Sequence, residues 1–153
     1  MHLVGPGGPT PGQTALEQWE GTRVPLATVA VNTGITAAIE LDVTEEDTAL
    51  HLGTGDVRVL STPRIVELCE QATVRALEGG VEDGRTSVGF RVEVTHLAPI
   101  AVGSHVVAVA TLERTEGKRL VFNVSVSDRC GLVAAGKVTR VLVDRAAFLD
   151  KAR

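Results

Sequence analysis

A glutamate and a histidine are the residues of this sequence whose placement most suggests chemistry. Glu70 lies within residues 61–80, which predict one long helix, and it directly follows Cys69 of that helix's apolar stripe. A carboxylate beside an apolar stripe must be solvated, paired or functional. His96 falls on the apolar side of the strand predicted for residues 87–97, so a helix packed there would bring the two groups within reach. A carboxylate held against an imidazole can work as a general base with its orienting partner.

Thr62 adds a hydroxyl at the start of the predicted helix. Pro63 follows it, and a proline in the first turn has a preset φ and no amide left without a partner. Thr62 is therefore the expected helix cap. Amides at a helix N-terminus can also stabilise negative charge that develops on a carbonyl oxygen. These groups together suit the attack of water on an activated carbonyl, which is acyl transfer to water.

Each of the three residues also has an ordinary structural interpretation. Glu70 alone could be a solvated helix residue, His96 a satisfied core histidine, and Thr62 a simple cap. The eight positions from Thr62 to Glu70 span about 12 Å along a helix, too far for a direct hydrogen bond. Unwinding of the chain at Pro63 could shorten this gap. Otherwise we expect a second subunit to supply part of the site.

The elements that position these groups follow from the spacing of apolar residues. The helical stripe ends before two glycines and consists of Ile65, Leu68, Cys69, Ala72 and Ala76. Five strands are predicted, over residues 37–43, 87–97, 104–115, 118–128 and 132–144. Residues 44–47 are expected to turn, residues 48–60 to form a loop, and residues 145–153 to include a short helix.

Two of the predicted strands have a clear apolar face. One face consists of Val88, Phe90, Val92 and Val94, followed in the same alternation by His96; the other consists of Leu120, Phe122, Val124 and Val126. An antiparallel sheet with one apolar face needs a cover, and the helix is the only large candidate. We therefore expect an α+β hot-dog fold, an antiparallel sheet wrapped around one long central helix. One helix covers such a sheet incompletely, so a homodimer is expected.

Composition excludes several classes of protein. The 153 residues suit one domain, which we place at residues 35–153, after an N-terminal extension of unknown role at residues 1–34. A net charge of −4 and 3% aromatic residues argue against a nucleic-acid partner. No apolar run approaches the roughly 20 residues of a membrane helix. Two cysteines give no disulfide framework, so a cytoplasmic location is expected. No metal site and no cofactor are expected.

Residues 40–145 resemble the fluoroacetyl-CoA thioesterase family of the hot-dog superfamily. The resemblance is carried by four short segments: Val59-Leu60-Ser61-Thr62, Glu70-Gln71-Ala72-Thr73-Val74-Arg75-Ala76, Val94-Thr95-His96 and Glu116-Gly117-Lys118-Arg119-Leu120. It implies that Thr62, Glu70 and His96 are the catalytic residues. It further implies that Gly89 offers a backbone amide to the acyl-CoA and that Arg140 contacts the substrate. By itself Gly89 could only relieve crowding on a strand, and Arg140 could form an ordinary ion pair.

One departure from the family concerns the acyl group. The fluoride-selective members place phenylalanines in a lid over the site, in the loop before the helix. Here that loop reads His51-Leu52-Gly53-Thr54-Gly55-Asp56, without such an aromatic residue. We therefore expect another short or medium acyl group as the substrate.

The resemblance implies hydrolysis of an acyl-CoA thioester to free acid and coenzyme A. Glu70 would either activate water or attack the thioester carbonyl itself, and the sequence leaves these two routes open. A non-catalytic acyl-CoA-binding hot-dog domain is the alternative, which would keep Gly89 and Arg140 but would not need Glu70. A hydratase shares the fold, but its usual Asp/His segment is not found here.

Overall fold

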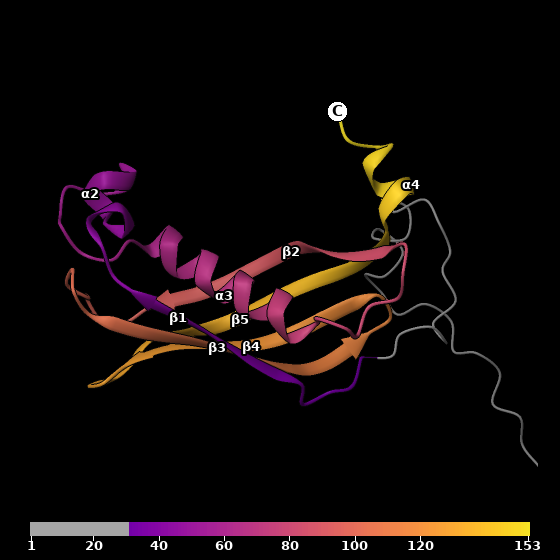
Figure 1. Cartoon of the computed structure of the whole chain (residues 1–153), viewed down its shortest axis with the longest axis horizontal. Coiled ribbons are helices and arrows are strands. Elements are labelled where there is room, and N and C mark those ends of the chain that lie inside the picture. The colour runs from indigo at the N-terminus through magenta and orange to yellow at the C-terminus, as the bar shows by residue number, and fades with distance from the viewer. Residues whose placement is uncertain (1–30) are drawn as a thin grey trace, which may run out of the picture.

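One curved antiparallel sheet wraps around one long helix (Figure 1). The computed structural model describes residues 31–153, so most of the predicted N-terminal extension lies outside the described residues. The sheet has five strands in the order β1-β3-β4-β5-β2. The elements are β1 (Thr36–Asp42), the 3-10 helix η2 (Glu45–Asp47), α2 (Ala49–Leu52), α3 (Thr62–Ala76), β2 (Arg85–His96), β3 (His105–Glu116), β4 (Arg119–Asp128), β5 (Gly131–Asp144) and α4 (Arg145–Leu149). The predicted sheet, central helix and C-terminal short helix are confirmed.

The start of α3 differs from the prediction in one useful respect. Ser61, and not Thr62, is the N-cap: its backbone is extended, and its hydroxyl accepts a 3.1 Å hydrogen bond from the Arg64 amide. Thr62 is the first helical residue, and Pro63 follows within the first turn. Because Ser61 does the capping, the Thr62 hydroxyl is free to bond elsewhere.

The apolar stripe of α3 packs on the concave side of the sheet. Ile65, Leu68, Cys69 and Ala72 are fully buried there. They meet the inner face of β4, whose members are Leu120, Phe122, Val124 and Val126, as predicted. Burial of a helical stripe against one face of a sheet is the packing that holds α3 across the strands.

Strand β2 contains a bulge that the sequence pattern does not reveal. Gly89 pairs with Arg140, but the next pair joins Arg91 to Thr139, which leaves Phe90 as the extra residue. An extra residue shifts the alternation of side chains by one. Gly89 therefore faces the helix on one side of the bulge, and His96 faces it on the other.

The bulge makes the predicted apolar face of β2 wrong for two of its four residues, Val88 and Phe90. Val92 and Val94 pack against the main core as predicted. Val88 instead packs in a second cluster, around Val141 and Val143. Phe90 is 50% exposed and lies under the Arg119 guanidinium, which is 5.3 Å from the ring centroid. Val88 and Phe90 therefore belong to the outer side of the sheet, not to the face that packs on the helix.

The segment before α3 is more ordered than the predicted turn and loop. It contains η2 and α2, with the Thr48 hydroxyl accepting a 3.1 Å bond from the His51 amide. Isolated bridges join Thr48 to Leu60 and Val59 to Ala101. These bonds fix the chain that leads into α3.

Strand β2 forms one edge of the sheet. One side of the strand pairs with β5, and no neighbour within residues 31–153 pairs with the other side. Free amides and carbonyls along such an edge are a template for a further strand. No helix among the same residues is long and apolar enough to cross a membrane.

Replacement of Gly136 by alanine tests the closeness of the sheet at β2. Gly136 pairs with Val94, and a Cβ at this position would lie 1.9 Å from the Glu93 carbonyl oxygen. Because that oxygen belongs to the backbone, the strands must move apart. We expect Gly136→Ala to lower the free energy of unfolding by about 2–3 kcal/mol in urea titrations. Gly80→Ala is the control, since its Cβ would meet only ordinary contacts; equal stability of the two variants would contradict this packing.

Candidate active site

Thr62 and His96 form a hydrogen-bonded pair. Thr62 begins α3 and His96 ends β2, and the Thr62 Oγ1 lies 2.9 Å from the His96 Nδ1. The other ring nitrogen, Nε2, lies 2.8 Å from the Ala98 carbonyl oxygen. A carbonyl oxygen can only accept, so Nε2 carries a proton. In the neutral ring Nδ1 is then the acceptor, and the Thr62 hydroxyl donates to it.

This arrangement can do chemistry at the threonine oxygen. An imidazole that accepts from a hydroxyl, while a third group fixes its other nitrogen, is the arrangement that activates hydroxyls in many enzymes. The Thr62 side chain is exposed, whereas His96 is half-buried. The oxygen is therefore accessible, and it sits at the N-terminus of α3, where backbone amides favour negative charge.

Glu70 belongs to a second group, with Arg140 and Ser87. Arg140 Nη1 donates to Glu70 Oε2 at 3.3 Å. The same guanidinium donates from Nε to the Ser87 hydroxyl at 2.9 Å and from Nη2 to the Ser87 carbonyl at 3.1 Å. Arg140 is only 6% exposed, and this burial lowers its pKa, an effect that Glu70 partly offsets. Arg140 thus forms an ion pair, the structural alternative considered from the sequence, and its partner is Glu70.

Gly89 makes room for the Glu70 carboxylate. A Cβ on Gly89 would lie 2.6 Å from Glu70 Oε2, closer than a nonbonded contact permits. The absence of a side chain on β2 therefore lets the carboxylate lie against the strand. Gly89 does relieve crowding on the strand, as considered from the sequence, and the side chain that it accommodates is Glu70.

Within one chain these two groups stay apart. The helix α3 is continuous from Thr62 to Ala76, so the unwinding considered at Pro63 does not occur. Thr62 and Glu70 are then about 12 Å apart along the helix axis. In the part of the chain described, the bonds of the Glu70 carboxylate go to Arg140 and none goes to Thr62 or His96. Each chain presents two half-sites, Thr62–His96 and Glu70–Arg140–Gly89.

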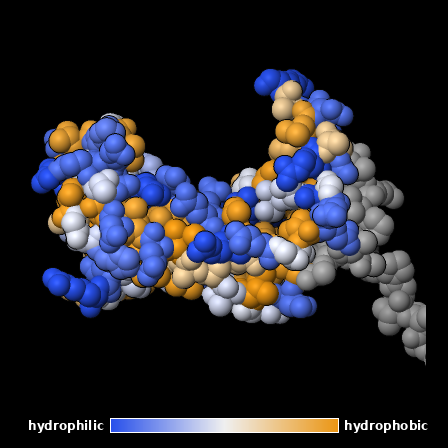
Figure 2. Space-filling model, in the orientation of Figure 1, coloured by the Kyte–Doolittle hydropathy of each residue, from blue (hydrophilic) through white to orange (hydrophobic). Residues whose placement is uncertain are grey.

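An open cleft runs along the solvent side of α3. Its volume is about 640 Å³, within the range of small-molecule sites. It is lined by Ile39, Pro63, Val66, Glu67, Glu70, Gln71, Val74, Arg75, Glu78 and Arg140. Figure 2 shows the surface hollowed between α2 and α4, with hydrophobic and hydrophilic side chains mixed. The Glu70 half-site therefore opens to a space large enough for a ligand.

Cys69 takes no part in this chemistry. It is buried in the core beside Glu70, and burial raises the pKa of its thiol to about 11, with a smaller contribution from the Glu70 charge. A thiol with so high a pKa carries almost no thiolate near neutral pH. The sequence-based interpretation of Cys69 as a small apolar residue is confirmed.

Sequence reasoning missed three partners of these half-sites. Ser87 holds Arg140, the Ala98 carbonyl fixes the His96 ring, and Asp47 binds Arg64 at the start of α3. The Arg64 Nε donates to the Asp47 carboxylate at 2.8 Å. A backbone carbonyl leaves no signal in a sequence, and Ser87 becomes visible only once the bulge in β2 is known.

Comparison with known proteins agrees with this fold. Residues 43–146 match the family of fluoroacetyl-CoA-specific thioesterases. The fluoroacetyl-CoA thioesterase of Streptantibioticus cattleyicolor is 35% identical over 95 residues, which cover 62% of this chain and 68% of that protein.

Solved structures give the same result. A structure of the fluoroacetyl-CoA thioesterase FlK superposes with a TM-score of 0.73 and 29% identity, over 78% of this chain and 93% of that chain. A hot-dog-like protein from Thermanaerovibrio acidaminovorans gives a TM-score of 0.74 at 30% identity, covering 80% of this chain and 90% of that one. The family match extends over more than half of the chain, and the two structural matches cover 78% and 80% of it. This chain therefore belongs to the fluoroacetyl-CoA-specific thioesterase family and has its hot-dog fold.

Proposed function

We propose that this chain hydrolyses a short or medium acyl-CoA thioester to the free acid and coenzyme A. Family membership supports the reaction class. The observation that carries the proposal is the Thr62–His96 hydrogen bond of 2.9 Å at the exposed N-terminus of α3. A hydroxyl in this position can hold or attack a thioester carbonyl, and the amides of the helix N-terminus favour the charge that develops on its oxygen.

In the proposed reaction Glu70 supplies the base. Its carboxylate takes a proton from water as the water oxygen bonds to the thioester carbon, the carbon–sulfur bond then breaks, and the thiolate leaves and is protonated. In the covalent variant the Glu70 oxygen bonds to the same carbon, the thiolate leaves, and water cleaves the resulting anhydride. In both variants the Thr62 hydroxyl turns its proton from His96 Nδ1 to the carbonyl oxygen when the substrate binds, and His96 Nδ1, then free to accept, relays the proton. Arg140 keeps the carboxylate oriented.

We propose that two copies form the complete site. The half-sites of one chain are too far apart to act on one carbonyl, and the β2 edge is open to a second copy. Two β2 strands paired antiparallel about a twofold axis near Glu93, with the bulged Phe90 unpaired, would set Gly89 of one copy opposite His96 of the other. The Glu70–Arg140–Gly89 group of one copy would then face the Thr62–His96 pair of the other.

The acyl group in this proposal is aliphatic. Residues 43–61, which precede α3, contain no Phe, Trp or Tyr. Leu50, Leu52 and Val57 in this segment are each about half exposed, and the Leu50 amide bonds the Val57 carbonyl at 3.0 Å. An apolar surface of this kind suits contact with a short or medium alkyl chain better than it suits selective recognition of a fluoroacetyl group.

A cytoplasmic location is proposed as well, since both cysteines are free thiols.

Replacement of Glu70 by glutamine tests the proposed base. We expect Glu70→Gln to reduce kcat by at least about 100-fold, because the amide cannot accept the proton. The measurement is the release of free thiol from acetyl-, fluoroacetyl-, butyryl- and hexanoyl-CoA. Glu78→Gln, on the same cleft and exposed, is the matched control and should keep its turnover. Full activity of Glu70→Gln would refute the role, and binding without thiol release by the unaltered chain would favour an acyl-CoA-binding domain.

Replacement of Gly89 by alanine tests whether the carboxylate must lie against β2. The new Cβ would meet only the end of the flexible Glu70 side chain, so folding should survive within about 1 kcal/mol while the carboxylate moves. We expect kcat to fall about 10-fold or more. A shorter acid in Gly89→Ala/Glu70→Asp returns space and should recover part of the loss. Unchanged turnover in Gly89→Ala, with the carboxylate displaced in its crystal structure, would contradict the argument.

A further inference from the structure

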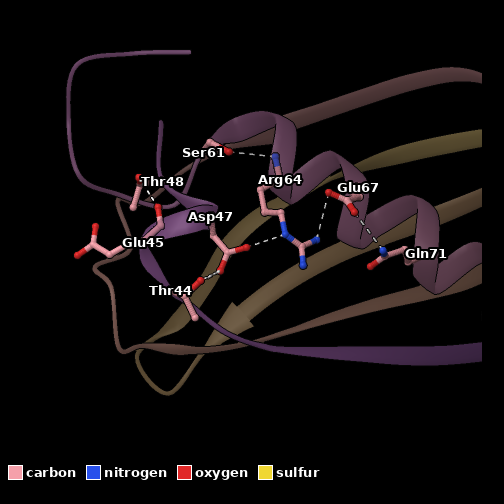
Figure 3. A network of polar contacts seen from close by, with 8 residues as sticks. All are labelled: Thr44, Glu45, Asp47, Thr48, Ser61, Arg64, Glu67 and Gln71. Carbon is pink, nitrogen blue, oxygen red and sulfur yellow. Dashed lines mark hydrogen bonds and ion pairs between the residues drawn. The ribbon is translucent and has the colours of Figure 1, made fainter. Parts of the chain in front are cut away.

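Asp47, in the short segment before α3, forms hydrogen bonds with residues on both sides of Thr62. The Asp47 main-chain oxygen accepts a 2.9 Å bond from the Ser61 amide, and its carboxylate Oδ1 accepts a 2.8 Å bond from Arg64 Nε. Figure 3 shows the ion pair bridging the end of η2 and the first turn of α3. Ser61 and Arg64 flank Thr62 in the chain, so Asp47 fixes the backbone on either side of the proposed catalytic hydroxyl.

The Asp47 carboxylate is itself held firmly. Its second oxygen accepts from the Thr44 amide at 2.8 Å and from the Thr44 hydroxyl at 3.1 Å. Asp47 is only 7% exposed. Desolvation by burial would raise its pKa, but the Thr44 amide, the Arg64 side chain and the Thr44 hydroxyl together lower it, so the carboxylate is ionised in the folded chain. A largely buried, charge-assisted pair with its other oxygen occupied has little freedom to move.

The Thr62 side chain is fixed by fewer hydrogen bonds than the Asp47 carboxylate. Its side chain is exposed, and its hydroxyl has the single bond to His96 among the contacts of the described chain. The position of Oγ1 is therefore set by the backbone of residues 61–64. A shift of about 1 Å in this backbone would break a 2.9 Å hydrogen bond and misplace the oxygen.

We propose that the Asp47–Arg64 ion pair is a positioning pair for Thr62. It holds the first turn of α3 against η2, so that Thr62 Oγ1 remains within hydrogen-bond distance of His96 Nδ1. Arg64 acts through the backbone, because its guanidinium contacts Asp47 and Glu67 and not His96. This inference rests on the proposed function for its effect on turnover, but its effect on the Thr62–His96 bond is independent of that function.

The first measurement follows the hydrogen bond directly. In a ¹⁵N NMR spectrum the Nδ1 shift of His96 reports whether that nitrogen accepts a bond, and Thr62→Val gives the value for the bond removed. We expect Asp47→Asn and Arg64→Met to move this shift toward the Thr62→Val value. Glu67→Gln is the matched control, because Glu67 contacts Arg64 at 3.4 Å but is exposed. It should leave the shift unchanged.

The second measurement is a double-mutant cycle on turnover. We expect Asp47→Asn to lower kcat about 10-fold with little change in KM, but to have no further effect in a Thr62→Val background. A purely structural role would lower kcat by the same factor in both backgrounds, or leave it unchanged, and either result would overturn the proposal. If Asp47→Asn does not fold, Arg64→Lys retains the charge without the Nε bond and serves in the same cycle. An unmoved His96 shift in the folded variants would overturn the proposal even if the chain hydrolyses no thioester.

Discussion

The rigidity of α3 is the constraint on which the site depends. The helix runs unbroken from Thr62 to Ala76, with its apolar stripe buried against the sheet, so Thr62 and Glu70 cannot approach each other. Thr62 and Glu70 instead form hydrogen bonds with different residues. His96 bonds the hydroxyl at the start of the helix, and Arg140 bonds the carboxylate farther along it. A hydrolytic site that uses both groups on one carbonyl then needs a second copy of the chain.

The sheet prepares each half-site through details of β2. The bulge at Phe90 turns Gly89 toward the helix on one side and His96 toward it on the other. Without the extra residue only one of these positions would share a face with the helix. Gly89 leaves space for the Glu70 carboxylate, and the buried guanidinium of Arg140 compensates its charge. The edge position of β2 places both half-sites beside the side on which another strand can add.

Much of the fold could be predicted from the sequence, because helix and strand periodicities are local properties. The stripe of α3 and the inner face of β4 follow directly from apolar spacing. The bulge at Phe90 and the bridges that order residues 48–60 could not, because they depend on pairing with other segments of the chain. The cap at Ser61 is a local bond to the Arg64 amide, but Ser61 and Thr62 are both favoured capping residue types, so the sequence does not decide between them. Spacing and family resemblance identified Thr62, Glu70 and His96, but pairing of the first with His96 and of the second with Arg140 required coordinates. Whether these residues catalyse a reaction together remains a prediction.

A mixed dimer tests the central claim most directly. One copy carries Glu70→Gln and the other carries His96→Ala, each with a different affinity tag, and the mixed dimer is purified through both tags. If the site combines half-sites of two chains, the mixed dimer has one intact site and one site with both substitutions. It should release thiol from acyl-CoA at about half the rate of the unaltered dimer, whereas each parent variant is inactive. A purified mixed dimer as inactive as its parents would contradict the account, as would a full-length chain that is an active monomer.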